Sequence, residues 1–148
     1  MDEASRKALS DIEEHGCHIL HVLEDDDGPR FSYSIGVEKT HGQPDAVIMG
    51  LKRELAHSML NDYAGRVSDG EVFEPGKMYS GFLEGFDVCF RLVETKNYRD
   101  YFGWGIWLHD GLDFRMLQLV YPSTSGVWPW SPEASDDFLH FQPALYAA

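Results

Sequence analysis

The sequence predicts a single α+β domain with a mainly antiparallel, twisted or barrel-like sheet and two to three helices packed at one side of it. Three observations lead to this prediction. Apolar stretches with the spacing of strands outnumber those with the spacing of helices. Short connections rich in turn residues join neighbouring strand stretches, as in antiparallel hairpins. The chain has 148 residues, 43% of them apolar, without an internal repeat or a linker, which suits one globular domain over residues 1–148.

The first expected element is an N-terminal helix within residues 1–16. Ala8, Leu9 and Ile12 recur at the spacing of one helix face. Gly16 suits the position that follows the last helical turn. We therefore expect this helix to end at about His15 and to place one apolar face on the domain.

Two strands are expected next, CHILHVL at 17–23 and FSYSIGV at 31–37. An Asp-Gly-Pro sequence lies between them, which predicts a hairpin. In the second strand the large residues alternate with Ser32, Ser34 and Gly36. This alternation predicts a half-buried strand with small residues on its other face.

The middle of the chain predicts a buried strand, a helix and a second hairpin. The strand is DAVIMGL at 45–51, and the helix KRELAHSMLNDYAG follows it with apolar residues three and four positions apart. Segment 79–94 contains two strand pieces on either side of Glu84-Gly85. These elements extend the expected sheet and cover it with its longest helix.

The C-terminal third is less uniform. The aromatic spacing within 97–109 fits a helix, but Gly103 and Gly105 disfavour one, so helix and extended structure both stay open. FRMLQLVYP at 114–122 predicts a strand that ends at its proline. Residues 131–148 are acidic and aromatic without a clear period, and we expect them to pack as a tail on the body of the domain.

The net charge of −13 is the largest signal in the composition. It disfavours nucleic acid and anionic membranes as partners and favours a basic protein. No apolar stretch is long enough to span a bilayer, and the charged N-terminus lacks the apolar centre of a signal peptide, so a cytoplasmic location is expected. Cys17 and Cys89 lie in apolar surroundings, which predicts buried, reduced thiols.

No motif for catalysis or metal binding is present. His15, His18 and His21 stand three residues apart around Cys17, but without the ligand spacing of a zinc site, so we interpret them as ordinary strand histidines and expect no metal. There is no GxSxG sequence and no phosphate-binding glycine loop. The sequence thus favours a binding protein over an enzyme, while an enzymatic activity stays open.

Acidic and aromatic residues are the candidate binding residues. An acidic turn between the first two strands offers exposed carboxylates to a basic partner. All four tryptophans lie in the last third, where they serve either the core or an exposed binding surface. The candidates are Asp25, Asp26, Asp27, Trp104, Trp107, Trp128 and Trp130. The leading hypothesis is a small acidic domain that binds a basic protein, as an inhibitor or immunity-type protein would.

A second hypothesis is a small-molecule site, with FMN as the alternative to having no cofactor. It would use the small-residue face of the strand at 31–37, and its candidate residues are Ser32, Tyr33, Ser34 and Gly36. The tryptophans would then form its walls, in one arrangement at the interface of a homodimer. A third hypothesis is a structural domain that dimerises through exposed aromatic residues.

Several stretches together resemble a bacterial family catalogued as domain of unknown function 4262. They are HGCHILHV, FSYSIGV, GQPDAVIMGL, MLND and LQLVYPSTSGVWPW, so the likeness extends from about His15 to Trp130. The chain departs from the family pattern at single positions: Cys17 replaces a usual tryptophan, Ser34 a threonine, Asp45 a glutamate and Ser123 an aspartate. The resemblance implies a compact α+β domain and no agreed activity.

Overall fold

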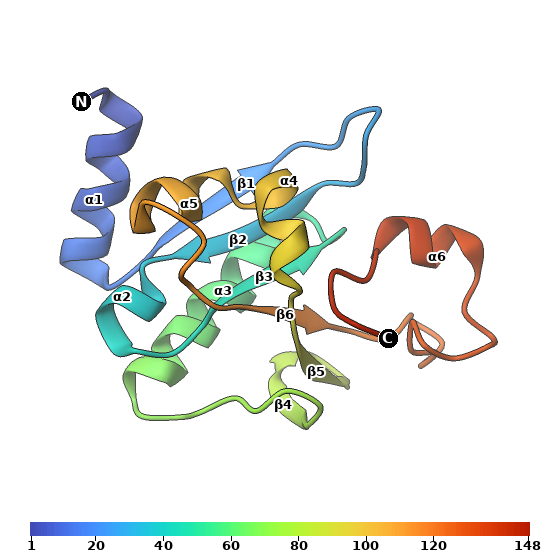
Figure 1. Ribbon diagram of the computed structural model, residues 1–148. Helices are drawn as coiled ribbons and strands as arrows, with labels where there is room; N and C mark the ends of the chain where they lie inside the picture. Colours follow the sequence, from blue (N-terminus) through green and yellow to red (C-terminus); the bar gives the residue numbers. More distant parts are fainter.

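A six-stranded mixed sheet forms the centre of the computed structural model, which describes residues 1–148 (Figure 1). In spatial order the strands are β1 (His18–Val22), β2 (Phe31–Ile35), β3 (Asp45–Met49), β6 (Met116–Val120), β5 (Phe86–Leu92) and β4 (Met78–Leu83). Only β3 and β6 run parallel, and the other neighbouring pairs are antiparallel. The predicted single α+β domain with a mainly antiparallel sheet is confirmed, and the sheet stays open rather than closing into a barrel.

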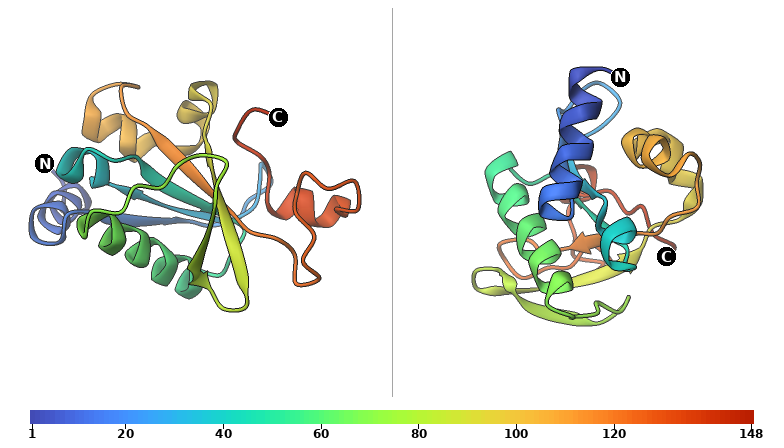
Figure 2. Two further views of the ribbon diagram at one scale, coloured as in Figure 1. Left: turned by 90° about the horizontal axis from the view of Figure 1, so that it is seen from below. Right: turned by 90° about the vertical axis from the view of Figure 1, so that its left-hand side faces the viewer.

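Helices cover both faces of this sheet, which corrects the prediction that they pack at one side. They are α1 (Glu3–His15), α2 (Val37–His41), α3 (Arg53–Ser68), α4 (Tyr98–Tyr101), α5 (Gly103–His109) and α6 (Asp136–Phe141), with a 3₁₀ turn at Thr95–Asn97. The long α3 lies on one face, and α4 and α5 lie on the other (Figure 2). None of these helices has both the length and the apolar character needed to cross a membrane.

Two hydrophobic clusters, one on each face, result from this arrangement. Along β3, Ala46 and Ile48 join the cluster under α3, whereas Val47 and Met49 join the cluster under α4 and α5. Successive side chains of a strand point to opposite faces, so a strand covered on both faces must be apolar throughout. This is why residues 46–49 (AVIM) are all apolar, in agreement with the buried strand predicted for 45–51.

The interpretation of β2 as a half-buried strand was wrong. Its large residues Phe31, Tyr33 and Ile35 face α4 and α5, and all five of its residues are buried. Ser32 and Ser34 face the opposite side of the sheet and are also buried. The strand ends at Ile35, earlier than expected, because Gly36 takes a left-handed conformation with φ of 97° and starts α2.

The ends of the two long helices follow from their sequences. The Asp2 carboxylate accepts the Ser5 N–H at the start of α1, and Gly16 closes the helix in a left-handed conformation. The predicted N-terminal helix is therefore confirmed. The α3 helix passes through Gly65 and ends at Ser68, followed by a left-handed Gly70.

The segment around 97–109, which the sequence left open, is helical. Its two short helices α4 and α5 meet at Phe102, which is fully buried. Gly105 allows α5 to approach the body closely, because a Cβ there would stand 2.8 Å from Cζ of Phe114. The glycine that disfavours a helix by propensity is thus required by packing.

The C-terminal residues contact the body through the end of β6. Gln142 is buried, and its side chain exchanges two hydrogen bonds with the backbone of Tyr121, at 3.1 and 2.9 Å. Leu145 belongs to the cluster under α4 and α5, and Tyr146 forms a β-bridge with Val93. Cys17 and Cys89 are buried and unbridged, as expected.

Candidate functional site

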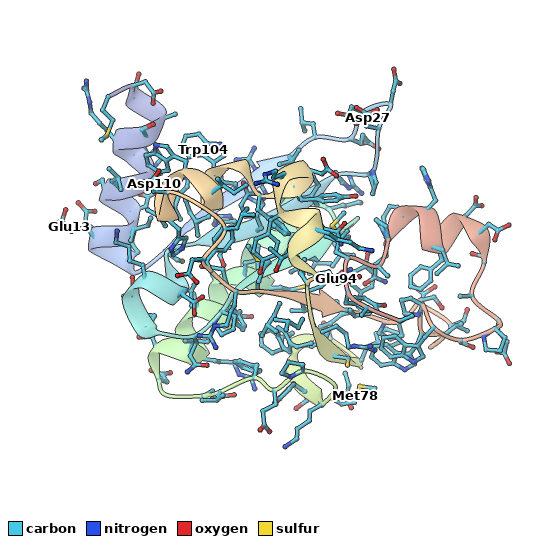
Figure 3. All side chains as sticks on the ribbon, viewed as in Figure 1. Glu13, Asp27, Met78, Glu94, Trp104 and Asp110 are labelled. Atoms are coloured by element: carbon cyan, nitrogen blue, oxygen red, sulfur yellow. The ribbon has the colours of Figure 1, made fainter.

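An open cleft of about 550 Å³ lies between the β1–β2 connection and the helices α4 and α5. Asp27 marks its outer end and Trp104 its helical wall, and the two side chains lie on the same side of the sheet (Figure 3). Asp25, Asp100 and Tyr101 also line it, together with residues of β2. We call this the acidic cleft. It brings together four of the residues selected from the sequence: Asp25, Asp27, Tyr33 and Trp104.

The β1–β2 connection holds its acidic residues through a tight turn. The Oδ1 atom of Asp25 accepts the backbone N–H of Asp27 at 2.9 Å and that of Gly28 at 3.1 Å. Asp25 and Gly28 also pair through their backbones. This local network leaves the side chain of Asp27 without an internal partner, while Asp26 lies at the tip, exposed and outside the cleft.

The opposite wall is held by aromatic packing. The hydroxyl of Tyr33 accepts the backbone N–H of Trp104 at 3.2 Å, which fixes the first turn of α5 to β2. Burial raises the pKa of Tyr33 to about 12, against the opposing effect of this hydrogen bond, so the phenol stays neutral. The ring of Phe31 meets that of Tyr101 edge to face, with centroids 5.3 Å apart.

The electrostatic character of the cleft is one-sided. Three carboxylates line it, those of Asp25, Asp27 and Asp100, and no lysine, arginine or histidine does. None of the three takes part in an ion pair. No cation of the chain lies over the ring of Trp104 or Tyr101. The cleft therefore offers both carboxylate and aromatic acceptors for a positive charge supplied from outside.

The four tryptophans form two separate pairs. Trp107 packs edge to face on Trp104, with centroids 5.3 Å apart, and is itself 40% exposed. Trp128 and Trp130 stack almost parallel at 5.1 Å, beside the C-terminal residues. The guanidinium of Arg91 already lies 5.5 Å from the ring of Trp130. The second pair is thus engaged by a cation of the chain itself, and neither of its rings belongs to the buried core.

The small-residue face proposed for a ligand lies inside the molecule. Ser34 donates a hydrogen bond to Asp45 at 2.9 Å and accepts the N–H of Ala46 at 3.1 Å. Gly36 is buried against the side chain of Ile12, to which a Cβ would come within 2.7 Å. Ser32 is bonded to His21. Of these candidates, Tyr33 alone reaches the acidic cleft.

Asp45 is a buried carboxylate that the sequence did not single out as a functional residue. It is 1% exposed and accepts hydrogen bonds from the hydroxyl of Ser34 and the N–H of Val37, both at 2.9 Å. Burial raises its pKa to about 7, although these bonds favour the charged form. Asp45 is the first residue of β3, and its carboxylate accepts the backbone N–H groups of Val37 and Glu38 at the start of α2, so it fixes the turn after β2. A lone acid at the head of an apolar strand was the signal for it.

Two residues of the acidic cleft, Asp100 and Tyr101, were also missed. They belong to the segment whose structure the sequence left open, so the direction in which their side chains point was not predictable. The available signal was an acid beside an aromatic residue in NYRDYFGWG. A helical interpretation of that segment would have placed Trp104 one turn from both.

The comparisons with known proteins bear on the family of the chain. A family model described as "Domain of unknown function (DUF4262)" matches residues 11–135. Nothing among curated proteins matched the chain, and no solved structure did. The matched range contains β1 to β6 and both walls of the acidic cleft. Because the match extends over most of the sequence, the chain belongs to the DUF4262 family of domains of unknown function.

Proposed function

We propose that this chain binds a basic protein by taking one of its lysine or arginine side chains into the acidic cleft. The observation that carries the proposal is the lining of the cleft, where the carboxylates of Asp25, Asp27 and Asp100 meet aromatic rings and no cation. Because no cation of the chain occupies the cleft, its carboxylates and rings are free to receive a positive charge from a partner.

The shape of a basic side chain matches the two kinds of lining. The methylene stem of a lysine or arginine packs on apolar and aromatic surface, which Phe31 and Trp104 provide in the cleft. Its charged end then pairs with Asp27 or Asp100 and lies over an aromatic ring. Arginine has the advantage of a planar fork that bonds two carboxylate oxygens and stacks on rings.

The charge of the whole chain supports the same partner. A net charge of −13 attracts a basic protein over a distance of about a Debye length, about 8 Å at physiological salt. Asp26, at the tip of the β1–β2 connection, is placed to meet the partner first. A partner whose own activity depends on the bound basic residue would be inhibited, as in an inhibitor or immunity pair.

The test compares two double variants of the full chain. Asp27→Asn/Asp100→Asn removes two charges from the cleft, and neither carboxylate makes an internal hydrogen bond. Asp62→Asn/Asp87→Asn removes two exposed charges elsewhere and serves as the matched control. Each is immobilised and exposed to a lysate of the native host at about 0.1 M salt and at about 1 M salt.

The proposal predicts a basic protein that the wild type and the control retain at low salt and release at high salt. The cleft variant should bind that protein about tenfold more weakly, measured on the purified pair. Equal binding by the cleft variant and the control would contradict the proposal. Capture of neutral or acidic proteins alone would contradict it as well.

A further inference from the structure

A second cavity of about 540 Å³ is lined by residues of α1, the edge strand β1 and α3. We call it the histidine groove. Its charge is opposite in kind to that of the acidic cleft, because one carboxylate faces two permanent cations and four histidines. The acidic, basic and histidine residues of the lining are Asp11, Lys7, Arg53, His15, His18, His21 and His57. In a chain with a net charge of −13 this is a local reversal.

The one acid of the groove is already engaged. The Oδ2 atom of Asp11 lies 2.8 Å from Nδ1 of His18 and 3.4 Å from Nζ of Lys7. The hydrogen bond to His18 is the main reason why the pKa of Asp11 is lowered. Arg53, in contrast, makes no ion pair and no hydrogen bond within the chain. Its charge is free for a ligand.

A chain of hydrogen bonds fixes the direction in which His57 presents its ring. Nδ1 of His21 lies 2.6 Å from Oγ of the buried Ser32, and Nε2 of His21 lies 3.1 Å from Nδ1 of His57. The contact with His21 is the only hydrogen bond of the buried Ser32 hydroxyl, and we assign Ser32 as its donor because this leaves no buried O–H group unpaired. His21 must then carry its proton on Nε2 and donate it to His57. The remaining proton of His57 is on Nε2, which acts as a donor toward the groove.

The surroundings of His21 favour its neutral form. Burial lowers the pKa of His21 most, and Arg53, His57 and His18 lower it further, while Glu54 acts in the opposite direction. A neutral His21 is the form that the Ser32 bond requires.

From this geometry we propose that the histidine groove binds a phosphate group. Arg53 and His57 stand four residues apart on α3 and both line the groove, so one anion bound there can meet the guanidinium and the Nε2–H. Lys7 faces them from α1. Cationic and N–H donors arranged around one anion are the usual recognition chemistry of phosphate. This site is independent of the acidic cleft and of the basic partner proposed for it.

The test is calorimetric titration of the full chain with inorganic phosphate and with glycerol 3-phosphate at neutral pH. Arg53→Gln should weaken binding about tenfold, since it removes a charged donor. Arg99→Gln is the matched control, because it removes the same charge from an exposed arginine of α4 that lies outside the groove. His57→Asn removes the second donor and should also weaken binding.

Binding of both ligands to the wild type and to Arg99→Gln, with the loss confined to the groove variants, would support the proposal. Tighter binding of the ester would assign the groove to an organic phosphate, and equal binding would assign it to the free anion. The proposal is overturned if neither ligand binds the wild type. It is also overturned if Arg53→Gln and Arg99→Gln weaken binding equally, since net charge alone would then explain the effect.

Discussion

The acidic cleft and the histidine groove are both built on the β1–β2 hairpin, yet they have opposite electrostatic character. The cleft collects three carboxylates without a cation, and the groove collects Lys7, Arg53 and four histidines around one engaged acid. The hairpin separates them because β2 sends Phe31 and Tyr33 to the cleft side and Ser32 to the other side. A net charge of −13 therefore agrees with the cleft but not with the groove, and the alternation of side chains along β2 places the two kinds of lining on opposite faces of the sheet.

The largest expected effect on the free energy of unfolding comes from removing the buried ring that holds α4 and α5 at the wall of the cleft. Phe102 is fully buried between Tyr33 and Tyr98, with ring centroids 5.2 and 5.6 Å away. Phe102→Ala should therefore lower the free energy of unfolding by about 3–5 kcal/mol, measured by urea denaturation. The control is Trp107→Ala on the exposed side of α5, which should lose less. An equal loss in both variants would show that α4 and α5 are not fixed by their buried ring.

The second effect concerns Asp45, which is buried where the cleft acids are exposed. Its folded pKa of about 7 lies above the ordinary 3.8, so the folded state holds the proton more tightly. Its contribution to the free energy of unfolding is then complete below about pH 4 and is lost as pH rises to about 7, by at most about 1.4 kcal/mol per pH unit.

The measurement is the difference in unfolding free energy between the wild type and Asp45→Asn across this pH range, because all other groups cancel in it. As pH rises, the unfolding free energy of the wild type should fall relative to that of Asp45→Asn. A difference that is constant or that grows in favour of the wild type would show that the hydrogen bonds of Ser34 and Val37 outweigh burial.

A third, smaller effect tests the link between β2 and the wall of the cleft. Tyr33→Phe removes the acceptor of the Trp104 N–H and should lower the free energy of unfolding by about 1 kcal/mol. Tyr101→Phe is the matched control in the same cleft, since its hydroxyl makes no internal hydrogen bond. Thermal unfolding of both variants provides the measurement, and identical midpoints would contradict the assigned role of Tyr33.

The smallest effect on stability comes from His21 in the histidine groove, and its dependence on pH is opposite to that of Asp45. The pKa of His21 is lowered below 6.5, chiefly by burial, so its contribution to stability is present above that pH and decreases on acidification. Titration of the histidine ring signals by NMR should give His21 a midpoint below 6.5. A midpoint above that value would mean that His21 is protonated in the folded chain and that the Ser32–His21–His57 hydrogen-bond chain is wrong.

The sequence predicted the regular elements well wherever local signals decide them. Gly16 marked the end of α1, and the apolar spacing of 52–65 located α3. It failed for β2, whose alternation looks half-exposed, because the cover over Ser32 and Ser34 comes from distant parts of the chain. The same applies to α5, where Gly105 fits only because Phe114 packs on it.

Single residues of the candidate site were predictable from the sequence, but their assembly into one cleft was not. Asp25, Asp27 and Trp104 were each selected from their local sequence, yet 77 residues separate Trp104 from Asp27, and only the fold brings them together. The same sequence features suggested Trp128 and Trp130, which form a different pair beside Arg91. Ser34 and Asp45, two departures from the family pattern, are direct hydrogen-bond partners, a relation that no single position reveals.

The most direct test of the cation-binding cleft is an NMR titration of the wild type with argininamide, observed at the four tryptophan indole N–H signals. We expect a saturable shift of the Trp104 signal, a smaller one for its neighbour Trp107, and none for Trp128 or Trp130, whose pair already holds Arg91. The Trp104 shift should be lost in Asp27→Asn/Asp100→Asn. An unchanged Trp104 signal, or a shift confined to Trp128 and Trp130, would contradict cation binding in the acidic cleft.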